Sequence, residues 1–198
     1  MPRRSQDGNE ADASNGNLRA EIERLRRDLA RAEGKIAELE ARADVDPLLD
    51  ILNRRGFERE LSRSLAFVKR YGAAAALTFI DLDGFKAVND LHGHAAGDTL
   101  LRAVAAALTG HVRASDVVAR LGGDEFGVLM WNLDEGRAAA KAEELEAIIG
   151  RVRAVHGAVE LSVGASAGVA ALDAGATSAA VIDAADRAMY ARKKARRA

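Results

Sequence analysis

Residues 117–130 read Val-Val-Ala-Arg-Leu-Gly-Gly-Asp-Glu-Phe-Gly-Val-Leu-Met, which is two short apolar runs separated by a polar turn. Paired glycines between apolar runs are typical of a β-hairpin, so we predict that each run is a strand. Gly122 and Gly123 make a tight turn possible, and they also let the backbone approach a ligand closely, because neither has a Cβ. The turn carries two adjacent carboxylates, Asp124 and Glu125.

The sequence on both sides of this hairpin alternates helical and strand-like apolar patterns, which indicates a mixed α/β domain over residues 45–198. We expect helices over residues 53–71, 85–91, 99–108, 135–152 and 179–194, and strands over residues 75–82, 117–121, 126–130 and within 159–172. The order contains a strand–helix–hairpin–helix–strand unit. We therefore predict an α/β (α+β) fold with a ferredoxin-like or palm-type central antiparallel sheet flanked by helices, preceded by an N-terminal coiled-coil helix.

That N-terminal helix is predicted over residues 18–44, where apolar residues recur at heptad spacing: Leu18, Ile22, Leu25, Leu29, Ala32, Ile36, Leu39 and Ala43. Isoleucine at most a positions with leucine at d positions favours a parallel two-stranded coil and hence a homodimer. The alternative is a single amphipathic helix on the domain's own surface, but the narrow stripe and the charged opposite face favour the coil. Residues 1–17 are polar and aperiodic, so we expect a disordered tail.

Composition excludes several classes of function. The 29 Lys and Arg residues nearly balance the 30 Asp and Glu residues, so no overall field draws the chain to nucleic acid or to an anionic membrane. Cysteine is absent, which excludes disulfides, thiolate metal sites and a cysteine nucleophile. No apolar run is long enough for membrane insertion. We therefore expect a cytoplasmic protein with no nucleic-acid partner.

Two acidic pairs are the first candidates for chemistry. Asp81 and Asp83 stand at the end of an apolar strand, and Asp124 and Glu125 stand in the hairpin turn. If the strands are neighbours, these carboxylates converge at one end of the sheet, where they would suit Mg²⁺ ions that bridge phosphates. The alternative for each pair taken alone is an ordinary solvent-facing turn.

The segment 122–126 resembles the signature that gives the GGDEF-domain diguanylate cyclase family its name. Further matches follow at the family's spacing over residues 46–197: Asp46, 53–57, 79–86, 89–90, 93–94, 97–98, 166–169, 184–190 and Lys193. The resemblance implies a catalytic domain that condenses two GTP molecules into cyclic di-GMP and two pyrophosphates. It also implies activity as a homodimer that depends on Mg²⁺, with Mn²⁺ able to replace it.

The resemblance also implies roles for the acidic residues. Asp81 and Asp124 resemble the metal ligands of the family, with the carbonyl group of Leu82 as a third ligand. Glu125 resembles the acidic residue beside the metals, which would help to deprotonate the attacking 3′-hydroxyl. Asp81, Asp124 and Glu125 together are the predicted catalytic set.

Asn89 and Asp98 resemble the pair that reads guanine. The Watson–Crick edge of guanine offers N1–H and N2–H₂ donors that a carboxylate can accept together, whereas adenine would leave Asp98 unpaired. The alternative for Asp98 is an N-cap of the helix expected from residue 99.

Lys86, Lys193 and Arg197 resemble the cations that contact phosphate, and Gly122 and Gly123 complete the predicted substrate-binding set. For Lys193 and Arg197 the alternative is a solvated basic helix end, which the helix dipole favours. The sequence departs from the family's pattern beside Arg197 and near the start of the domain. Arg196 stands where the family prefers glycine, and residues 48–51 read Leu-Leu-Asp-Ile in place of Leu-Thr-Gly-Leu.

Arg113 and Asp116 form an Arg-x-x-Asp motif that five residues separate from the glycine pair, which resembles the placement of the family's inhibitory product site. Arginine can form two hydrogen bonds with guanine O6 and N7, and aspartate can accept from N1 and N2, so the resemblance implies feedback inhibition by cyclic di-GMP. The alternative is a surface ion pair at spacing three. The competing functions for the whole chain are a non-catalytic module that senses GTP or cyclic di-GMP, and a coiled-coil scaffold with an inert cap.

Overall fold

The computed structural model describes residues 21–29, 31 and 44–197, and the chain divides into two units, Met1–Ala43 and Asp44–Ala198. In the first unit, residues 21–29 are helical. The three apolar heptad residues within this stretch, Ile22, Leu25 and Leu29, are 46%, 55% and 60% exposed. The rest of the predicted coil and the predicted tail lie outside the described residues. Within the described part of the chain, no helix is long and apolar enough to cross a membrane.

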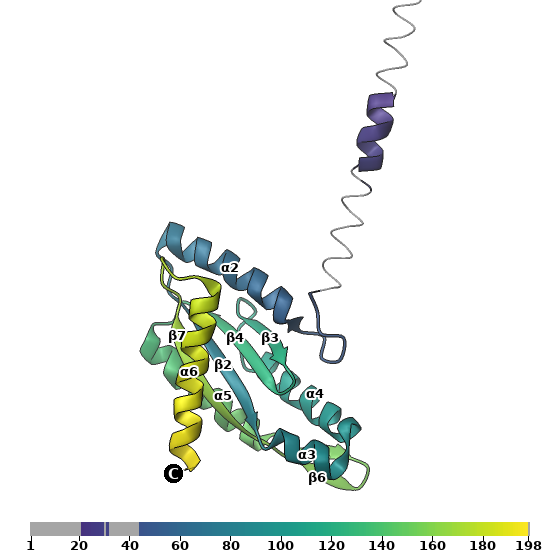
Figure 1. The fold of residues 1–198 in the computed structure, drawn as a ribbon, viewed down its shortest axis with the longest axis vertical. Coiled ribbons are helices and arrows are strands. Elements are labelled where there is room, and N and C mark those ends of the chain that lie inside the picture. Colours follow the sequence, from purple (N-terminus) through teal and green to yellow (C-terminus); the bar gives the residue numbers. More distant parts are fainter. Residues whose placement is uncertain (1–20, 30, 32–43, 198) are drawn as a thin grey trace, which may run out of the picture. The chain divides into compact units, whose positions relative to one another are not determined.

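The second unit is built on a five-stranded sheet in the order β1-β3-β4-β2-β7 (Figure 1). Its strands are β1 (Leu52–Asn53), β2 (Ala75–Asp83), β3 (Val117–Gly122), β4 (Glu125–Trp131) and β7 (Gly164–Ala171). Strands β2, β3, β4 and β7 pair antiparallel, and only the short β1 pairs parallel, with β3. Strands β5 (Ala154–His156) and β6 (Val159–Leu161) form a separate hairpin. The predicted ferredoxin-like antiparallel sheet is confirmed.

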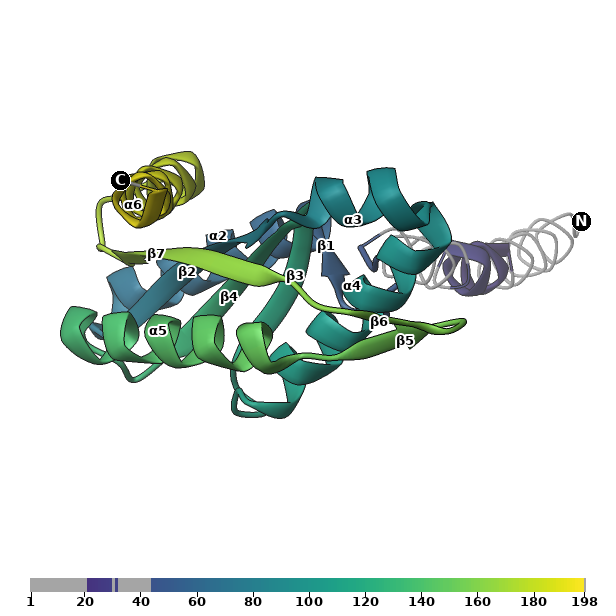
Figure 2. The ribbon, with the colours of Figure 1, turned by 90° about the horizontal axis from the view of Figure 1, so that it is seen from below.

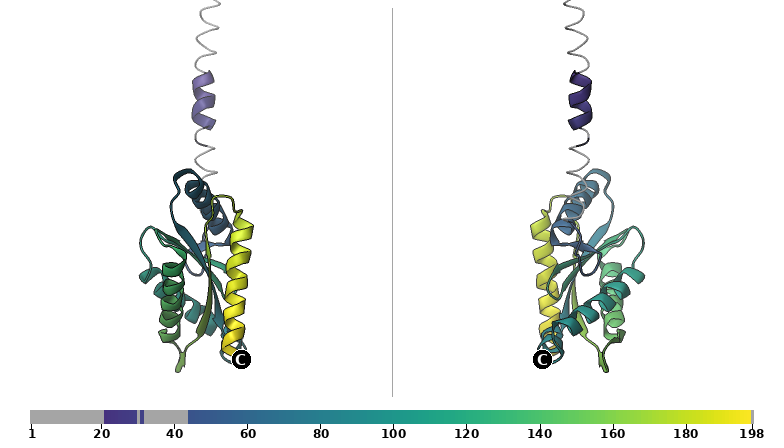
Figure 3. Two further views of the ribbon diagram at one scale, coloured as in Figure 1. Left: turned by 90° about the vertical axis from the view of Figure 1, so that its left-hand side faces the viewer. Right: turned by 90° about the vertical axis from the view of Figure 1, so that its right-hand side faces the viewer.

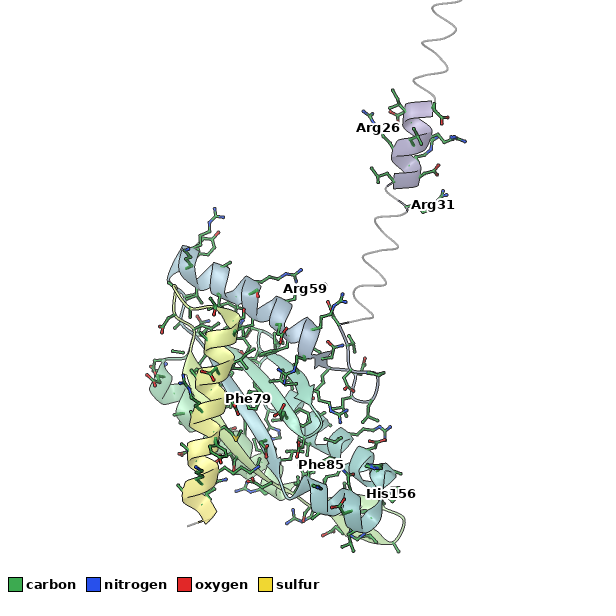
Figure 4. The ribbon with its side chains drawn as sticks, in the orientation of Figure 1. Arg26, Arg31, Arg59, Phe79, Phe85 and His156 are labelled. Carbon is green, nitrogen blue, oxygen red and sulfur yellow. The ribbon has the colours of Figure 1, made fainter. Side chains whose placement is uncertain are left out.

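Helices cover both faces of this sheet (Figures 2 and 3). Helices α2 (Arg54–Tyr71) and α6 (Ser178–Arg197) pack on one face, and α4 (His94–Gly110) and α5 (Glu135–Arg151) pack on the other. Helix α3 (Phe85–His92) joins β2 to α4. Side chains alternate along a strand, so Phe79 of β2 packs under α2 and α6 (Figure 4). Leu77 belongs to the same cluster, while Ile80 packs under α4 and α5.

Helix α4 begins at His94, five residues before the start that its apolar pattern predicts. The break between α3 and α4 is made by Gly93, whose φ of 83° is costly for any other residue. The first turn of α4 consists of small and polar residues, so no apolar stripe marks it in the sequence. Strands β1 and β5 also escape prediction, because two and three residues are too few to display alternation.

Helix α6 lies close against the sheet at Gly168 of β7. A Cβ at this position would lie 2.0 Å from the backbone nitrogen of Met189, so only glycine allows the helix to approach this far. Met189 and Ala185 are buried at the same contact. The close packing carries the C-terminal turns of α6 toward the end of β2.

Candidate active site

The end of β2 brings acidic side chains from two strands together. Asp81 lies opposite Glu125 of β4 and opposite Ser166 of β7 in the strand register. Asp81 and Asp83 follow Phe79 at intervals of two, so they share the face that α2 and α6 cover. The side chain of Leu82 points to the other face and is buried there, so only the backbone of Leu82 is available beside Asp81 and Asp83.

The hairpin turn is fixed to the end of β2 by main-chain contacts. The N–H group of Leu82 donates to the carbonyl oxygen of Asp124 at 3.1 Å, outside the regular ladder. The strand pairing runs through Gly122 and Glu125, which leaves Gly123 and Asp124 as the two residues of the turn. A register shift between Arg120 and Gly122 marks a bulge at this point, and bulges re-aim the side chains beside them.

Two arginines hold this turn. Arg120 donates from Nη2 and Nε to the carbonyl oxygen of Gly123, at 2.8 and 3.1 Å, and its Nη1 lies 3.2 Å from Asp46 Oδ2. Arg54, at the start of α2, donates from Nε to the carbonyl oxygen of Leu121 at 2.6 Å. The backbone around the turn therefore accepts hydrogen bonds from two positive charges.

Glu125 is the acidic residue whose pKa the surroundings change most clearly. Burial raises the pKa of Glu125, the Arg54 guanidinium 3.3 Å away opposes the rise, and the negative charges of Asp124, Asp81 and Asp186 add to it. The net result is a pKa above the ordinary value of a glutamate. Such a carboxylate is a better proton acceptor than a free one.

Lys193 of α6 reaches the two aspartates at the end of β2. Its Nζ donates to Asp81 Oδ1 and lies 3.4 Å from Asp83 Oδ1. Burial lowers the pKa of Lys193, but the hydrogen bond and charge of Asp81, followed by the charge of Asp83, outweigh it and raise the pKa above its ordinary value. The pair Asp81 and Asp83 therefore already binds one cation, the lysine ammonium.

Asp83 belongs to the same cluster. Its Oδ2 accepts a 2.7 Å hydrogen bond from the hydroxyl group of Ser166, which is fully buried. Its Oδ1 is buried without a hydrogen bond and forms an ion pair with Lys193 Nζ at 3.4 Å. Within the described residues, no three His, Cys, Asp or Glu side chains are grouped closely enough to hold a metal ion by themselves.

The residues predicted to read guanine lie on α3 and α4, beyond the end of β2. Asn89 of α3 packs against Gly97 of α4, where a Cβ would lie 2.0 Å from Asn89 Oδ1. This contact brings Asn89 beside the residue that precedes Asp98. Because α4 begins at His94, Asp98 lies inside the helix and its alternative role as an N-cap is wrong.

Lys86, which is predicted to contact phosphate, is exposed in the first turn of α3, where the helix dipole does not favour a cation.

The predicted product site lies at the opposite end of β3 from the acidic turn. Arg113 and Asp116 line a cavity of about 390 Å³ together with His111, Arg137 and Lys141. The Asp116 carboxylate accepts the N–H groups of Arg113 at 3.0 Å and of Trp131 at 3.2 Å. The side chain of Asp116 therefore caps the backbone here, in place of the surface ion pair that was the alternative.

Some predicted residues are therefore gathered and others are not. Asp81, Glu125 and Lys193 meet on the α2 and α6 face, with the Asp124 backbone bound to Leu82. Arg197 ends α6 four residues after Lys193, and its side chain lies outside the described residues. The sequence pattern pairs Asp83 with Asp81, but it gave no role to three further members of the cluster, Arg54, Arg120 and Ser166. Arg54 and Ser166 lie in segments that match the family, which is the one signal that could have pointed to them, because the contacts themselves join separate elements.

Fold and site together define the class of this unit: a ferredoxin-like domain with an acidic centre at the end of its central strand and a two-helix segment beyond it. The model of the diguanylate cyclase GGDEF domain matches residues 43–198. The chain belongs to the GGDEF domain family of diguanylate cyclases.

Individual relatives agree with this assignment. The chain is 43% identical over 173 residues to a probable diguanylate cyclase, DgcE, of Escherichia coli, covering 84% of this chain and 15% of the relative. It is 39% identical over 168 residues to the diguanylate cyclase TpbB of Pseudomonas aeruginosa, covering 83% and 38%. This chain therefore spans less than half of either relative's length.

Solved structures match as well. The GGDEF domain of TpbB from Pseudomonas aeruginosa aligns with a TM-score of 0.70 at 39% identity, covering 76% of this chain and 88% of that chain. The coiled coil and GGDEF domain of DgcB from Caulobacter crescentus, in complex with c-di-GMP, aligns with a TM-score of 0.75 at 27% identity, covering 93% and 95%.

Proposed function

We propose that this chain is a diguanylate cyclase, which condenses two GTP molecules into cyclic di-GMP and releases two pyrophosphates. The observation that carries the proposal is the meeting of Asp81 and Glu125 across β2 and β4, with Lys193 bound beside them. Family membership supplies the reaction class. An acidic centre with a lysine ammonium group beside it suits a nucleoside triphosphate that binds together with a divalent metal ion.

The residues fit a hard divalent cation, with Mg²⁺ as the natural ion and Mn²⁺ as its substitute. The carboxylates of Asp81 and Asp124 and the carbonyl group of Leu82 would hold it. Mg²⁺ is characteristically bound through one or two carboxylates and substrate phosphates, so a dedicated cluster of three acidic side chains is not required. The ion pair between Lys193 and Asp81 supports the fit, because it shows that this carboxylate attracts positive charge. When bound, the metal neutralises phosphate charge and lowers the pKa of the 3′-hydroxyl.

The chain's own groups would divide the remaining work. Glu125, with its raised pKa, would accept the proton of the 3′-hydroxyl. Lys86, Lys193 and Arg197 would contact the triphosphate. Asn89 and Asp98 would read the guanine edge, where Asp98 accepts from N1–H and N2–H₂. A Cβ added to Gly123 would meet no atom within 4 Å, so the space beside the hairpin backbone is open to the nucleotide.

Two domains are needed for one product, because each 3′-hydroxyl must attack the α-phosphorus of the other nucleotide. We propose that the N-terminal helix pairs in a parallel coiled coil and brings two domains face to face. The exposure of Ile22, Leu25 and Leu29 supports this assembly, because it leaves the apolar stripe available to a second chain. The structure of DgcB that aligns with 93% of this chain joins a coiled coil to a GGDEF domain.

We also propose that cyclic di-GMP inhibits the enzyme at Arg113 and Asp116. The cavity beside them has Arg137 and Lys141 on its wall, so positive charge is available for the product's phosphates. In the aligned structure, DgcB is in complex with c-di-GMP. The cavity lies at the far end of β3 from the acidic turn, so product bound there would act by shifting the arrangement of domains.

The purified full chain, incubated with GTP and Mg²⁺, should form cyclic di-GMP and pyrophosphate in a 1:2 ratio, measured by chromatography and mass spectrometry. Asp124→Asn should abolish turnover while the circular dichroism spectrum and melting temperature stay close to wild type, since the turn tolerates an amide but metal binding loses a charge. Product formation by folded Asp124→Asn would refute the metal assignment. Binding of cyclic di-GMP without any turnover would point to the sensing module instead.

A further inference from the structure

Glu146 of α5 is a buried carboxylate that the proposed chemistry does not use. Its side chain is only 4% exposed. The neighbouring buried positions of α5 are apolar, namely Ala138, Ala142, Leu145 and Ile149. A charge in such a stripe is costly unless it is fully paired.

The pairing comes from two other elements. Glu146 Oε1 accepts the N–H group of Ala167 in β7 at 2.7 Å and lies 3.0 Å from Arg192 Nε. Glu146 Oε2 accepts from Arg192 Nη2 at 3.1 Å and from Arg196 Nη2 at 2.6 Å. We call these three side chains, Glu146, Arg192 and Arg196, the α6 clamp.

The clamp fixes the C-terminal turns of α6. Arg192 and Arg196 are one turn apart on the same side of the helix, and Arg196 also donates from Nη1 to the carbonyl oxygen of Ala165 at 2.6 Å. Glycine at position 196 could make neither contact. This chain therefore holds the end of α6 against β7 by charge-assisted hydrogen bonds, which are about twice as strong as neutral ones.

Lys193 lies between the two clamp arginines in the sequence and points about 100° around the helix from Arg192. With Arg192 and Arg196 held on α5 and β7, Lys193 faces β2, where it contacts Asp81 and Asp83. A rotation of α6 that released the arginines would also move the lysine away from the aspartates.

We propose that Glu146 is a positioning residue for phosphate binding: it orients α6 so that Lys193 meets the triphosphate of the bound nucleotide. The identity of the ligand rests on the proposed function. The competing explanation is a purely structural Glu146, whose loss would weaken the fold without selecting among ligands.

The test compares two ligands in the full chain: the α,β-methylene analogue of GTP with Mg²⁺, measured by calorimetry, and guanosine, measured by saturation-transfer NMR. Glu146→Gln keeps the shape and removes the charge. It should weaken binding of the analogue about tenfold, the size of one lost charge-assisted hydrogen bond, and leave guanosine unchanged. Lys193→Met should give a similar selective loss, and the double variant should bind no more weakly than Lys193→Met alone.

Glu143→Gln is the matched control. Glu143 is on the same helix and contacts the same Arg192, at 3.1 Å, but its side chain is 61% exposed. The control should bind both ligands as the wild type does. Arg196→Met, at a side chain that is 47% exposed, serves if Glu146→Gln does not fold, and it should show a smaller loss of the same selectivity.

Equal losses for both ligands, or additive losses in the double variant, would overturn the positioning role. So would a Lys193→Met variant that binds the analogue as tightly as the wild type. A wild type that does not bind the analogue at all would instead refute the proposed function, and the two failures are therefore distinguishable.

Discussion

Asp81 and Glu125 lie directly opposite each other on β2 and β4, with both side chains on the face covered by α2 and α6. The pKa of Glu125 is raised, chiefly by burial and in smaller part by the negative charges of Asp124 and Asp81, against the opposing charge of Arg54. Ionising Glu125 therefore lowers the stability of the fold, and a bound cation would relieve this cost.

The first prediction concerns stability and pH. A raised pKa means that ionising Glu125 costs more in the folded chain than in the unfolded chain, so stability is lost as pH rises through the folded pKa. Glu125→Gln removes this loss. The variant and the wild type should differ little below the ordinary pKa of a glutamate, and the variant should become the more stable as pH rises above it. Thermal melts without divalent metal, measured from pH 3.5 to 7.5, would contradict this if the difference did not depend on pH.

The second prediction concerns the N-terminal unit. Deletion of residues 1–43 should lower the specific activity at low protein concentration and should be partly rescued at high concentration, because dimerisation becomes limiting. Leu25→Glu in the full chain should act like the deletion, since it places a charge in the apolar stripe. Arg27→Ala, away from that stripe, is the control. A truncated monomer with full activity at low concentration would show that the coil is irrelevant to catalysis.

The third prediction separates Arg113 from Asp116. Arg113→Ala should retain activity and lose inhibition by added cyclic di-GMP, as initial rates would report. Asp116→Ala should also lose stability, by about 1–2 kcal/mol, because the backbone N–H groups of Arg113 and Trp131 lose their acceptor. Inhibition curves that are identical for wild type and Arg113→Ala would remove both residues from a product site.

The fourth prediction concerns Asp50, which has a φ of 55° in the left-handed region. A side chain in this left-handed region costs about 1–2 kcal/mol, somewhat less for aspartate, whereas glycine costs about 0.5–1 kcal/mol of unfolded-state entropy. Asp50→Gly should therefore raise stability by roughly 0.5 kcal/mol, or about 1–2 °C in melting temperature. Asp50→Ala should lower it, and a melt in which both variants fall would contradict the assignment of strain.

The sequence predicted the sheet and the meeting of its acidic residues for a physical reason. A strand whose last residues include Asp81 and a hairpin that turns at Asp124 must bring those carboxylates to one end of the sheet if the strands pair. The contact between Arg54 and Glu125 spans 71 residues and depends on how α2 lies over the sheet, which no local pattern encodes. Glu146 carries even less of a signal, because a buried glutamate and an exposed one look alike until the helix is packed.

The contact between Gly97 and Asn89 has a consequence for how this domain could diverge. The side chains proposed to read the base stand on two helices that approach each other closely at Gly97, while the acidic residues stand on strands and in the hairpin turn that joins two of them. Replacement of Asp98 could therefore change which purine the domain prefers without altering how the two helices pack. The acidic residues on the sheet would keep their positions, so base preference and bond formation can be selected as separate traits.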